Sequence, residues 1–315
     1  MPQNRRNFLK SAGILAGSAM FVTNQNAITP QAMAQTARST GPEVFINQYT
    51  VETFYGRDGI NLMQNLDRCF AELKEAGVAG FEVSAGQPEE LDQYITALKK
   101  QDLQLRSIYV SPNVHDEATA EAEIKRVIAV AERAKTAGTK FVVANPQAKS
   151  GKSDAELNLQ NRSLDTLGAA LRKLGMKLAM HYHTTELEFA AREFHSFMCD
   201  TSPENVWLCY DVHWSYRASG NSAISTYNHA QLYGDRVVEL HLRQSQGGTW
   251  TESFVAKGDI DYDKAFAILR QSKAFDDCHI VLEQAPENGT PKTLKPIDVF
   301  KQSVEAVKKM VLHQN

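Results

Sequence analysis

The sequence predicts an α/β fold, a closed (β/α)8 barrel, and three observations support this prediction. Apolar runs with strand character alternate with amphipathic helical stretches from residue 43 onward, which indicates parallel strands joined by helices. Eight such runs occur in the 315-residue chain, as expected for a barrel of about 250 residues. No G-x-G-x-x-G follows the first run, where Asn47-Gln48-Tyr49-Thr50 stands instead, and this argues against an open dinucleotide-binding sheet.

The expected strands are short apolar runs, and the expected helices repeat apolar residues every three or four positions. Leu164, Leu167 and Leu171, for example, share one helix face, and Gly175 follows where a left-handed C-cap is expected. We expect segment 146–161 to be a loop with a short helix over the barrel mouth, and 297–312 to be a final outer helix. The strands are expected at residues 44–49, 80–84, 103–110, 140–144, 177–183, 206–213, 236–242 and 279–284.

The first 34 residues are expected to be an export signal outside the fold. Arg5-Arg6 lies in a segment that resembles the twin-arginine export motif, and the apolar run 12–22 is shorter than the ~20 residues of a spanning helix. Ala32-Met33-Ala34 offers a cleavage site, although an uncleaved anchor or a basic start without export function is the alternative. We therefore expect the twin-arginine export machinery as a partner and a periplasmic mature protein without a stable membrane span. It would have a flexible segment at 35–42 and a single barrel domain at 43–315.

Composition gives no broad basic surface for nucleic acid, and we expect no such partner. The formal net charge is -3 at pH 7. The first 34 residues carry three of the 34 basic residues and none of the 37 acidic ones, which leaves 31 basic residues and a net charge of -6. The four cysteines show no C-x-x-C spacing and are expected to be free thiols, although an oxidising compartment would permit a Cys199–Cys209 bridge.

Side chains of metal-ligand type gather at the ends of the last four expected strands. Active sites of such barrels lie at the carboxyl ends of the strands, so these side chains should meet at the barrel mouth. Mixed imidazole and carboxylate ligands suit a divalent ion such as Mn²⁺, Zn²⁺ or Co²⁺. The candidates are His181, His183, Asp211, His213, His241 and Glu283.

The same residue types also have structural interpretations. A single strand histidine is often a hydrogen-bonded core residue, which is the alternative for His183 and His213. Glu188 and Glu239 are expected to face solvent or to be structural. A carboxylate that ends an apolar strand is costly to bury without a cation or donors, so Asp211 and Glu283 are harder to explain by structure alone.

Five segments, in this order and spacing, resemble motifs of the sugar phosphate isomerase/epimerase family. Segment 177–189, which contains His181-Tyr182-His183, resembles its YHNHDFEF-like motif, and segment 208–214 resembles its strand-six aspartate segment. Segment 236–243 resembles its HLKD segment, 257–262 its G-x-G-x-I-D-W turn, and 281–284 its last-strand glutamate. The resemblance covers residues 43–312 and implies a xylose isomerase-like TIM barrel.

The resemblance also implies a divalent ion held by residues from strands five to eight. Three of the family's four ligands correspond to Asp211, His241 and Glu283. The strand-five glutamate is replaced, and we expect Glu186 to reach back from the loop as the fourth ligand. The chain further departs from the family at Leu242-Arg243, where Lys-Asp is common. The alternatives for the fourth ligand are His181, which stands at the family's glutamate position, and His183.

By this resemblance we expect a metal-dependent isomerase or epimerase for a keto-sugar or sugar derivative. It would remove a proton next to the carbonyl, and the ion would stabilise the enediolate. Glu283 and Glu186 are expected to be base and acid, with His183 as a further catalytic residue that could protonate a leaving group. Substrate contacts are expected from His181, His213, Glu82 and Trp214.

An exported enzyme has little access to cytoplasmic phosphorylated sugars, and no Arg/Lys cluster marks a phosphate site. The expected substrate is therefore a small unphosphorylated sugar, a keto-sugar or a 3-keto-glycoside, and a homo-oligomer is compatible with the sequence. A metal-dependent sugar dehydratase or 3-keto-glycoside lyase would share every ligand. A non-catalytic periplasmic sugar-binding barrel is the second alternative. An endonuclease-IV-like repair enzyme would need more ligands and a basic face.

Overall fold

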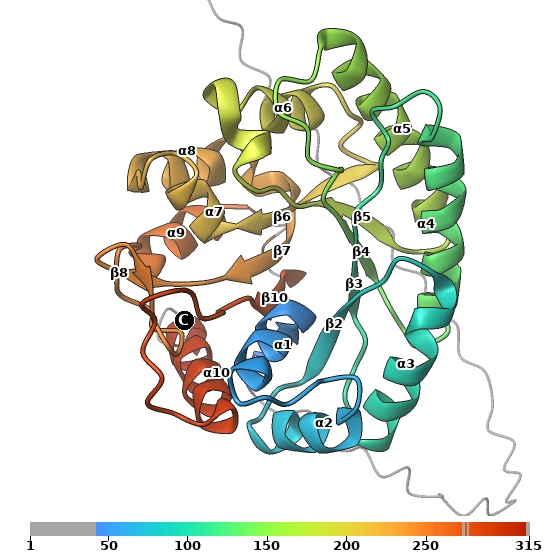
Figure 1. Cartoon of the computed structure of the whole chain (residues 1–315). Helices are drawn as coiled ribbons and strands as arrows, with labels where there is room; N and C mark the ends of the chain where they lie inside the picture. Colours follow the sequence, from blue (N-terminus) through green and yellow to red (C-terminus); the bar gives the residue numbers. More distant parts are fainter. Residues whose placement is uncertain (1–41, 273–274, 276, 313–315) are drawn as a thin grey trace, which may run out of the picture. The chain divides into compact units, whose positions relative to one another are not determined.

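The computed structural model describes residues 42–272, 275 and 277–312 (Figure 1). The expected export signal, its cleavage site and residues 35–41 lie outside the described residues. The described residues all lie within one compact unit. Among the described helices, none is both long enough and apolar enough to cross a membrane.

Eight parallel strands close into a barrel, which confirms the predicted fold class. The strand order around the barrel is β1-β10-β7-β6-β5-β4-β3-β2, so each strand pairs with its neighbour in the chain and β10 closes the ring against β1. A separate hairpin, β8 (Ser245–Gln246) and β9 (Thr249–Trp250), follows β7. The barrel strands are β1 (Phe45–Asn47), β2 (Gly80–Ser84), β3 (Ser107–Val110), β4 (Phe141–Ala144), β5 (Lys177–Met180), β6 (Val206–Asp211), β7 (Val237–Leu242) and β10 (His279–Leu282).

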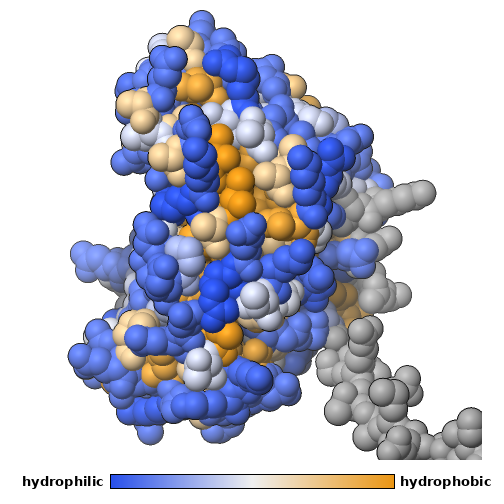
Figure 2. Space-filling view, turned by 90° about the vertical axis from the view of Figure 1, so that its right-hand side faces the viewer, coloured by the Kyte–Doolittle hydropathy of each residue, from blue (hydrophilic) through white to orange (hydrophobic). Residues whose placement is uncertain are grey.

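Helices surround the barrel (Figure 1). On α5, Leu164, Leu167 and Leu171 are fully buried, as their spacing predicts. Figure 2 shows one side of the molecule, where hydrophilic side chains predominate and hydrophobic ones lie mainly between them. The helices are α1 (Gln48–Arg57), α2 (Leu66–Glu75), α3 (Leu91–Lys100), α4 (Ala120–Lys135), α5 (Asp154–Lys173), α6 (Glu188–Cys199), α7 (Val212–Arg217), α8 (Ala223–Tyr233), α9 (Tyr262–Leu269) and α10 (Pro296–Leu312).

Several strands end earlier than expected, and side-chain caps explain two of these ends. The Asn47 side chain accepts a hydrogen bond from the Thr50 backbone N–H, which starts α1 directly after β1. Asp211 does the same for the Trp214 N–H, and α7 therefore begins at Val212. As a result His213 lies on a helix and not on strand six.

The segments after β4 and β5 differ from the expected loop with a short helix at 146–161 and from the expected strand at 177–183. The expected short helix within 146–161 is the start of the long α5, where Ser153 and Glu156 form a capping box. Strand β5 ends at Met180, so His181 and His183 follow the strand. The first turn of α6 has left-handed backbone at Phe189 to Ala191, with φ of 51°, 59° and 60°. Such angles are uncommon for residues other than glycine, and they mark a kink at the start of α6.

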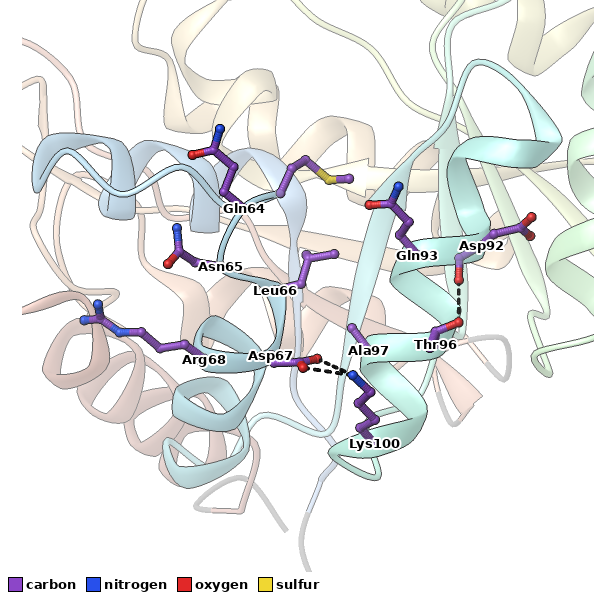
Figure 3. Close-up of a pocket in the computed structure, with 11 residues that line it drawn as sticks. Gln64, Asn65, Leu66, Asp67, Arg68, Asp92, Gln93, Thr96, Ala97 and Lys100 are labelled. Atoms are coloured by element: carbon purple, nitrogen blue, oxygen red, sulfur yellow. Dashed lines mark hydrogen bonds and ion pairs between the residues drawn. The ribbon is translucent and has the colours of Figure 1, made fainter.

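The four cysteines are free thiols, and Cys209 is fully buried in β6. A groove of about 620 Å³ lies between α2 and α3 on the outer helix layer (Figure 3). Its lining includes an exposed ion pair between Lys100 and Asp67, 2.8 Å apart, and no histidine or cysteine. This groove therefore lacks the imidazoles that the strand ends carry.

Candidate metal centre

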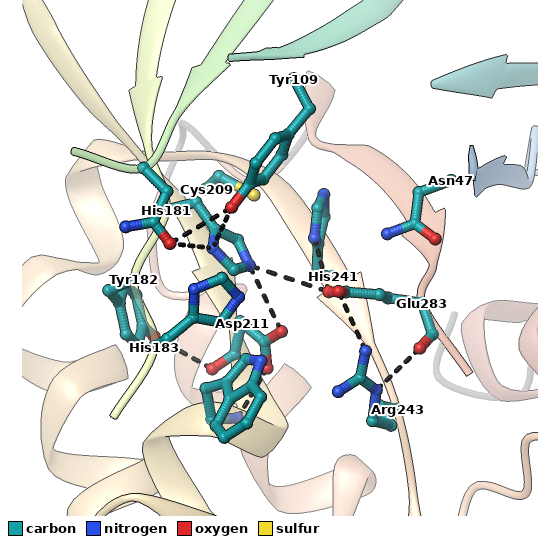
Figure 4. Close-up of polar contacts among 12 residues, drawn as sticks. Asn47, Tyr109, His181, Tyr182, His183, Cys209, Asp211, His241, Arg243 and Glu283 are labelled. Atoms are coloured by element: carbon teal, nitrogen blue, oxygen red, sulfur yellow. Dashed lines mark hydrogen bonds and ion pairs between the residues drawn. The ribbon is translucent and has the colours of Figure 1, made fainter. Parts of the chain in front are cut away.

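Four side chains of metal-ligand type converge where β5, β6, β7 and β10 end (Figure 4). One potential ligand atom from each lies within 4.8 Å of all the others, and all four residues are buried. Two are imidazoles and two are carboxylates, a donor set that suits a borderline divalent ion. The four residues are His181, Asp211, His241 and Glu283.

The two histidines hold the cluster together through close polar contacts. His241 Nδ1 lies 2.9 Å from Glu283 Oε2. His181 Nε2 lies 3.5 Å from Asp211 Oδ2 and 3.7 Å from Glu283 Oε2. Neither His181 Nε2 nor Asp211 Oδ2 has a hydrogen-bond partner, although both atoms are buried. Orphaned polar atoms are costly to bury, and a shared cation would satisfy them.

The other polar atom of two of these side chains is occupied by the protein. His181 Nδ1 lies 3.3 Å from the Tyr109 hydroxyl and 3.4 Å from Asn145 Oδ1. Asp211 Oδ1 accepts the Trp214 N–H at 2.7 Å. His181 Nε2 and Asp211 Oδ2 remain free within the cluster. These two side chains could therefore bind a divalent ion and keep their contacts with Tyr109, Asn145 and Trp214.

Arg243 compensates the charge of Glu283. Its Nη2 lies 2.9 Å from Glu283 Oε1, its Nε donates to the Glu283 carbonyl at 2.7 Å, and its guanidinium stacks over Trp250 at 4.1 Å. Burial alone would raise the pKa of Glu283, but Arg243 and the two imidazoles hold it well below the usual value. Glu283 is therefore ionised at neutral pH.

The cluster borders a cavity of about 330 Å³ at the barrel mouth. Glu283 belongs to both the cluster and the cavity wall, so a bound molecule could reach the ion-binding atoms there. Charged, polar and aromatic groups line this cavity, as in sites that bind sugars through hydroxyl contacts and ring stacking. The lining residues are Asn47, Tyr49, Glu82, Ser84, Tyr109, His183, Trp214, Arg243, Trp250 and Glu283.

A family model described as a xylose isomerase-like TIM barrel matches residues 70–310. The chain belongs to this family. Its relatives include an inosose dehydratase of Clostridium perfringens, 25% identical over 71% of this chain and 84% of that protein.

Two solved structures resemble this xylose isomerase-like barrel in fold. A sugar phosphate isomerase/epimerase from Parabacteroides distasonis has 14% sequence identity and a TM-score of 0.65, with 89% of this chain and 98% of that chain covered. A xylose isomerase-like TIM barrel protein from Mycobacterium smegmatis, solved in complex with magnesium, has 12% identity and a TM-score of 0.64. That match covers 87% of this chain and 98% of the other.

In this xylose isomerase-like barrel the cluster contains His181 and not Glu186. Glu186 lies in a short 3-10 turn, Thr185–Leu187, where its Oε2 accepts the His183 backbone N–H at 2.7 Å. Its other oxygen is buried without a hydrogen-bond partner. The loop carboxylate that we expected to complete the cluster thus caps its own loop, and the imidazole of His181 occupies the corresponding place.

Of the other residues that we expected to act in catalysis or to bind substrate, three line the cavity and one does not. His183, Glu82 and Trp214 line the cavity. Burial lowers the pKa of His183 to about 3, so this imidazole is neutral at neutral pH. His213 is absent from the lining, and its Nε2 lies 3.1 Å from the Ser245 hydroxyl.

Of the two roles expected for Glu239, facing solvent or being structural, the structure excludes the first. It is fully buried in β7, and its Oε1 lies 3.1 Å from His241 Nε2. The signal was present in the sequence, since residues two apart on a strand point to the same face and His241 faces inward. Arg243 and Tyr109 were also not singled out as parts of the site.

Proposed function

We propose that the chain is a metal-dependent isomerase or epimerase that moves a proton next to the carbonyl of a keto-sugar or sugar derivative. The observation that carries this proposal is the convergence of His181, Asp211, His241 and Glu283 beside a polar and aromatic cavity. A divalent ion held by these four residues would polarise a substrate carbonyl and acidify the neighbouring C–H bond.

The side chains of this cavity would bind the substrate and carry its proton. Glu283 is ionised and borders the cavity, so it can accept a proton from carbon. His183 borders the same cavity from the loop after β5 and is neutral, so it can accept or donate a proton from another direction. Two proton carriers at one cavity, one directly after β10 and one after β5, would allow a proton to be removed and returned.

Specific contacts would orient the sugar. Glu82, Asn47 and Tyr109 offer polar atoms to hydroxyl groups, while Trp214 and Trp250 offer aromatic faces. The substrate would be unphosphorylated, because Arg243 is the only arginine or lysine in this cavity's lining and its guanidinium already pairs with Glu283. An address in the periplasm, inferred from residues 1–34, supports the same substrate class.

A metal-dependent dehydratase or lyase is the second candidate, and one observation favours it. The relatives that match over 71% of this chain are inosose dehydratases, at 25% identity. Dehydration would begin with the same proton removal by Glu283 and would end with loss of a hydroxyl on the next carbon. A non-catalytic sugar-binding barrel would need no ion.

The test is to incubate the purified protein with keto-sugars, inososes and 3-keto-glycosides in D₂O, with and without Mn²⁺, and to follow the reaction by NMR. We expect ion-dependent deuterium incorporation next to the carbonyl, together with an isomer or epimer. An unsaturated or deoxygenated product would replace the first candidate by the second. No reaction and no stoichiometric ion would contradict both.

A further inference from the structure

Two buried carboxylates to which the proposed reaction assigns no proton transfer lie next to His241 of the candidate metal centre. Glu239 on β7 is fully buried, and Glu82 on β2 is 1% exposed. Both approach the same atom: His241 Nε2 lies 3.1 Å from Glu239 Oε1 and 3.3 Å from Glu82 Oε1. This nitrogen is the one that faces away from Glu283.

The surroundings of these carboxylates offer few other partners. Glu82 Oε2 accepts the Ser107 hydroxyl at 2.8 Å, while Glu82 Oε1 and Glu239 Oε2 have no hydrogen-bond partner. The Cys209 thiol lies 3.9 Å from Glu239 Oε1, which is a weak contact. The imidazole of His241 is therefore the main polar group that these two acids share, and burying them without it would be costly.

A hydrogen bond at Nε2 decides how the other nitrogen of His241 can act. A neutral imidazole carries one proton, so an Nε2–H that donates to a carboxylate leaves Nδ1 unprotonated and able to bind a cation. Nδ1 is the atom that lies 2.9 Å from Glu283 Oε2, inside the cluster. A carboxylate behind a metal-bound histidine fixes its ring orientation and raises its basicity.

We propose that Glu239, supported by Glu82, is a positioning residue that holds His241 with Nε2–H toward the barrel interior and Nδ1 toward the divalent ion. This inference rests on the proposed function, because it requires an ion at the cluster. The competing arrangement is a second ion below the first, since Cys209, Glu239 and His241 also bring potential ligand atoms within 4.8 Å of one another. A second ion would occupy Nε2 in place of the proton.

The test measures ion binding directly. Ion-free protein is titrated with Mn²⁺, free Mn²⁺ is followed by electron paramagnetic resonance, and ions per chain are counted. We expect one ion per wild-type chain and roughly 10–100-fold weaker binding by Glu239→Leu. Glu239→Gln keeps an oxygen that can accept the Nε2–H, so its affinity should stay close to wild type. Glu193→Gln is the matched control, because Glu193 is similarly buried but pairs with Lys152 outside the cluster.

Each outcome separates the two proposals. A wild-type chain that binds no divalent ion overturns the proposed function. Three other outcomes would overturn the role of Glu239 and leave the proposed function standing. They are wild-type Mn²⁺ affinity in Glu239→Leu, equally weakened affinity in the leucine and glutamine variants, and two ions per chain. If the leucine variant does not fold, ¹⁵N NMR of the Zn²⁺-loaded wild type decides: we expect His241 protonated at Nε2, and protonation at Nδ1 would refute the inference.

Discussion

Replacing Arg243 by methionine tests whether the cluster is built around a cation. Arg243 is 1% exposed and pairs with Glu283, whose side chain is 9% exposed. Methionine keeps most of the stem but leaves the carboxylate buried without the guanidinium, a change that typically costs about 3–5 kcal/mol. His241 and His181 still lie 2.9 and 3.7 Å from Glu283 Oε2, so we expect a loss near the lower end, about 3 kcal/mol.

A bound divalent ion should change this loss. With the ion present the charge of Glu283 is compensated from the cluster side, so Arg243→Met should destabilise the ion-loaded protein less than the ion-free protein. Urea unfolding with and without saturating Mn²⁺, at equal protein concentration, measures both losses. Arg217→Met is the matched control, because Arg217 also stacks on Trp250, at 4.6 Å, but pairs with Glu287 instead. Equal losses for Arg243→Met in both states would refute the reasoning.

Three further predictions concern the reacting carboxylate, a buried histidine and a buried ion pair. Glu283→Gln should lower proton exchange by about 10²–10⁴-fold, with an unchanged circular dichroism spectrum; full exchange would remove Glu283 from the reaction. Burial lowers the pKa of His279 from 6.5 to about 3, so stability should fall as pH drops below 6.5. His279→Phe should reduce that slope by about 1.4 kcal/mol per pH unit in urea titrations at about pH 4–6; an unchanged slope would contradict this. Lys152→Met should cost about 3 kcal/mol of unfolding free energy, because the buried Glu193 carboxylate keeps only the hydrogen bond from Gln160; a loss below about 1 kcal/mol would argue against that pairing.

The fold was predictable because its pattern is local. Apolar runs and amphipathic stretches alternate along the chain, and eight of them leave a closed barrel as the simplest parallel arrangement. The ends of the strands were less predictable, because a polar side chain can cap the next helix as readily as it can extend the strand. Asn47 and Asp211 both cap helices in this way, and that is why His213 lies on α7.

The candidate site was also predictable only in part: the positions of residues at strand ends could be predicted, whereas loop conformation and side-chain packing could not. Position at a strand end was enough to select Asp211, His241 and Glu283, which the structure brings together. The conformation of the loop after β5 could not be derived from the sequence. It depends on the hydrogen bond from the His183 backbone N–H to Glu186 and on the left-handed backbone of residues 189–191. Strand alternation with His241 would have predicted the inward direction of Glu239, but its contact with His241 depends on side-chain packing inside the barrel.

The four cluster residues all come from the second half of the barrel, on or directly after β5, β6, β7 and β10, whereas Asn47, Glu82 and Tyr109 on β1 to β3 form much of the remaining cavity wall. Substitutions within residues 42–110, other than at Glu82 and Tyr109, which contact His241 and His181, could therefore alter which molecule is accommodated while the ion-binding half stays intact. A library of substitutions within residues 42–110, with Glu82 and Tyr109 kept, would be a practical route to new substrate preferences. Natural divergence among related barrels could follow the same route.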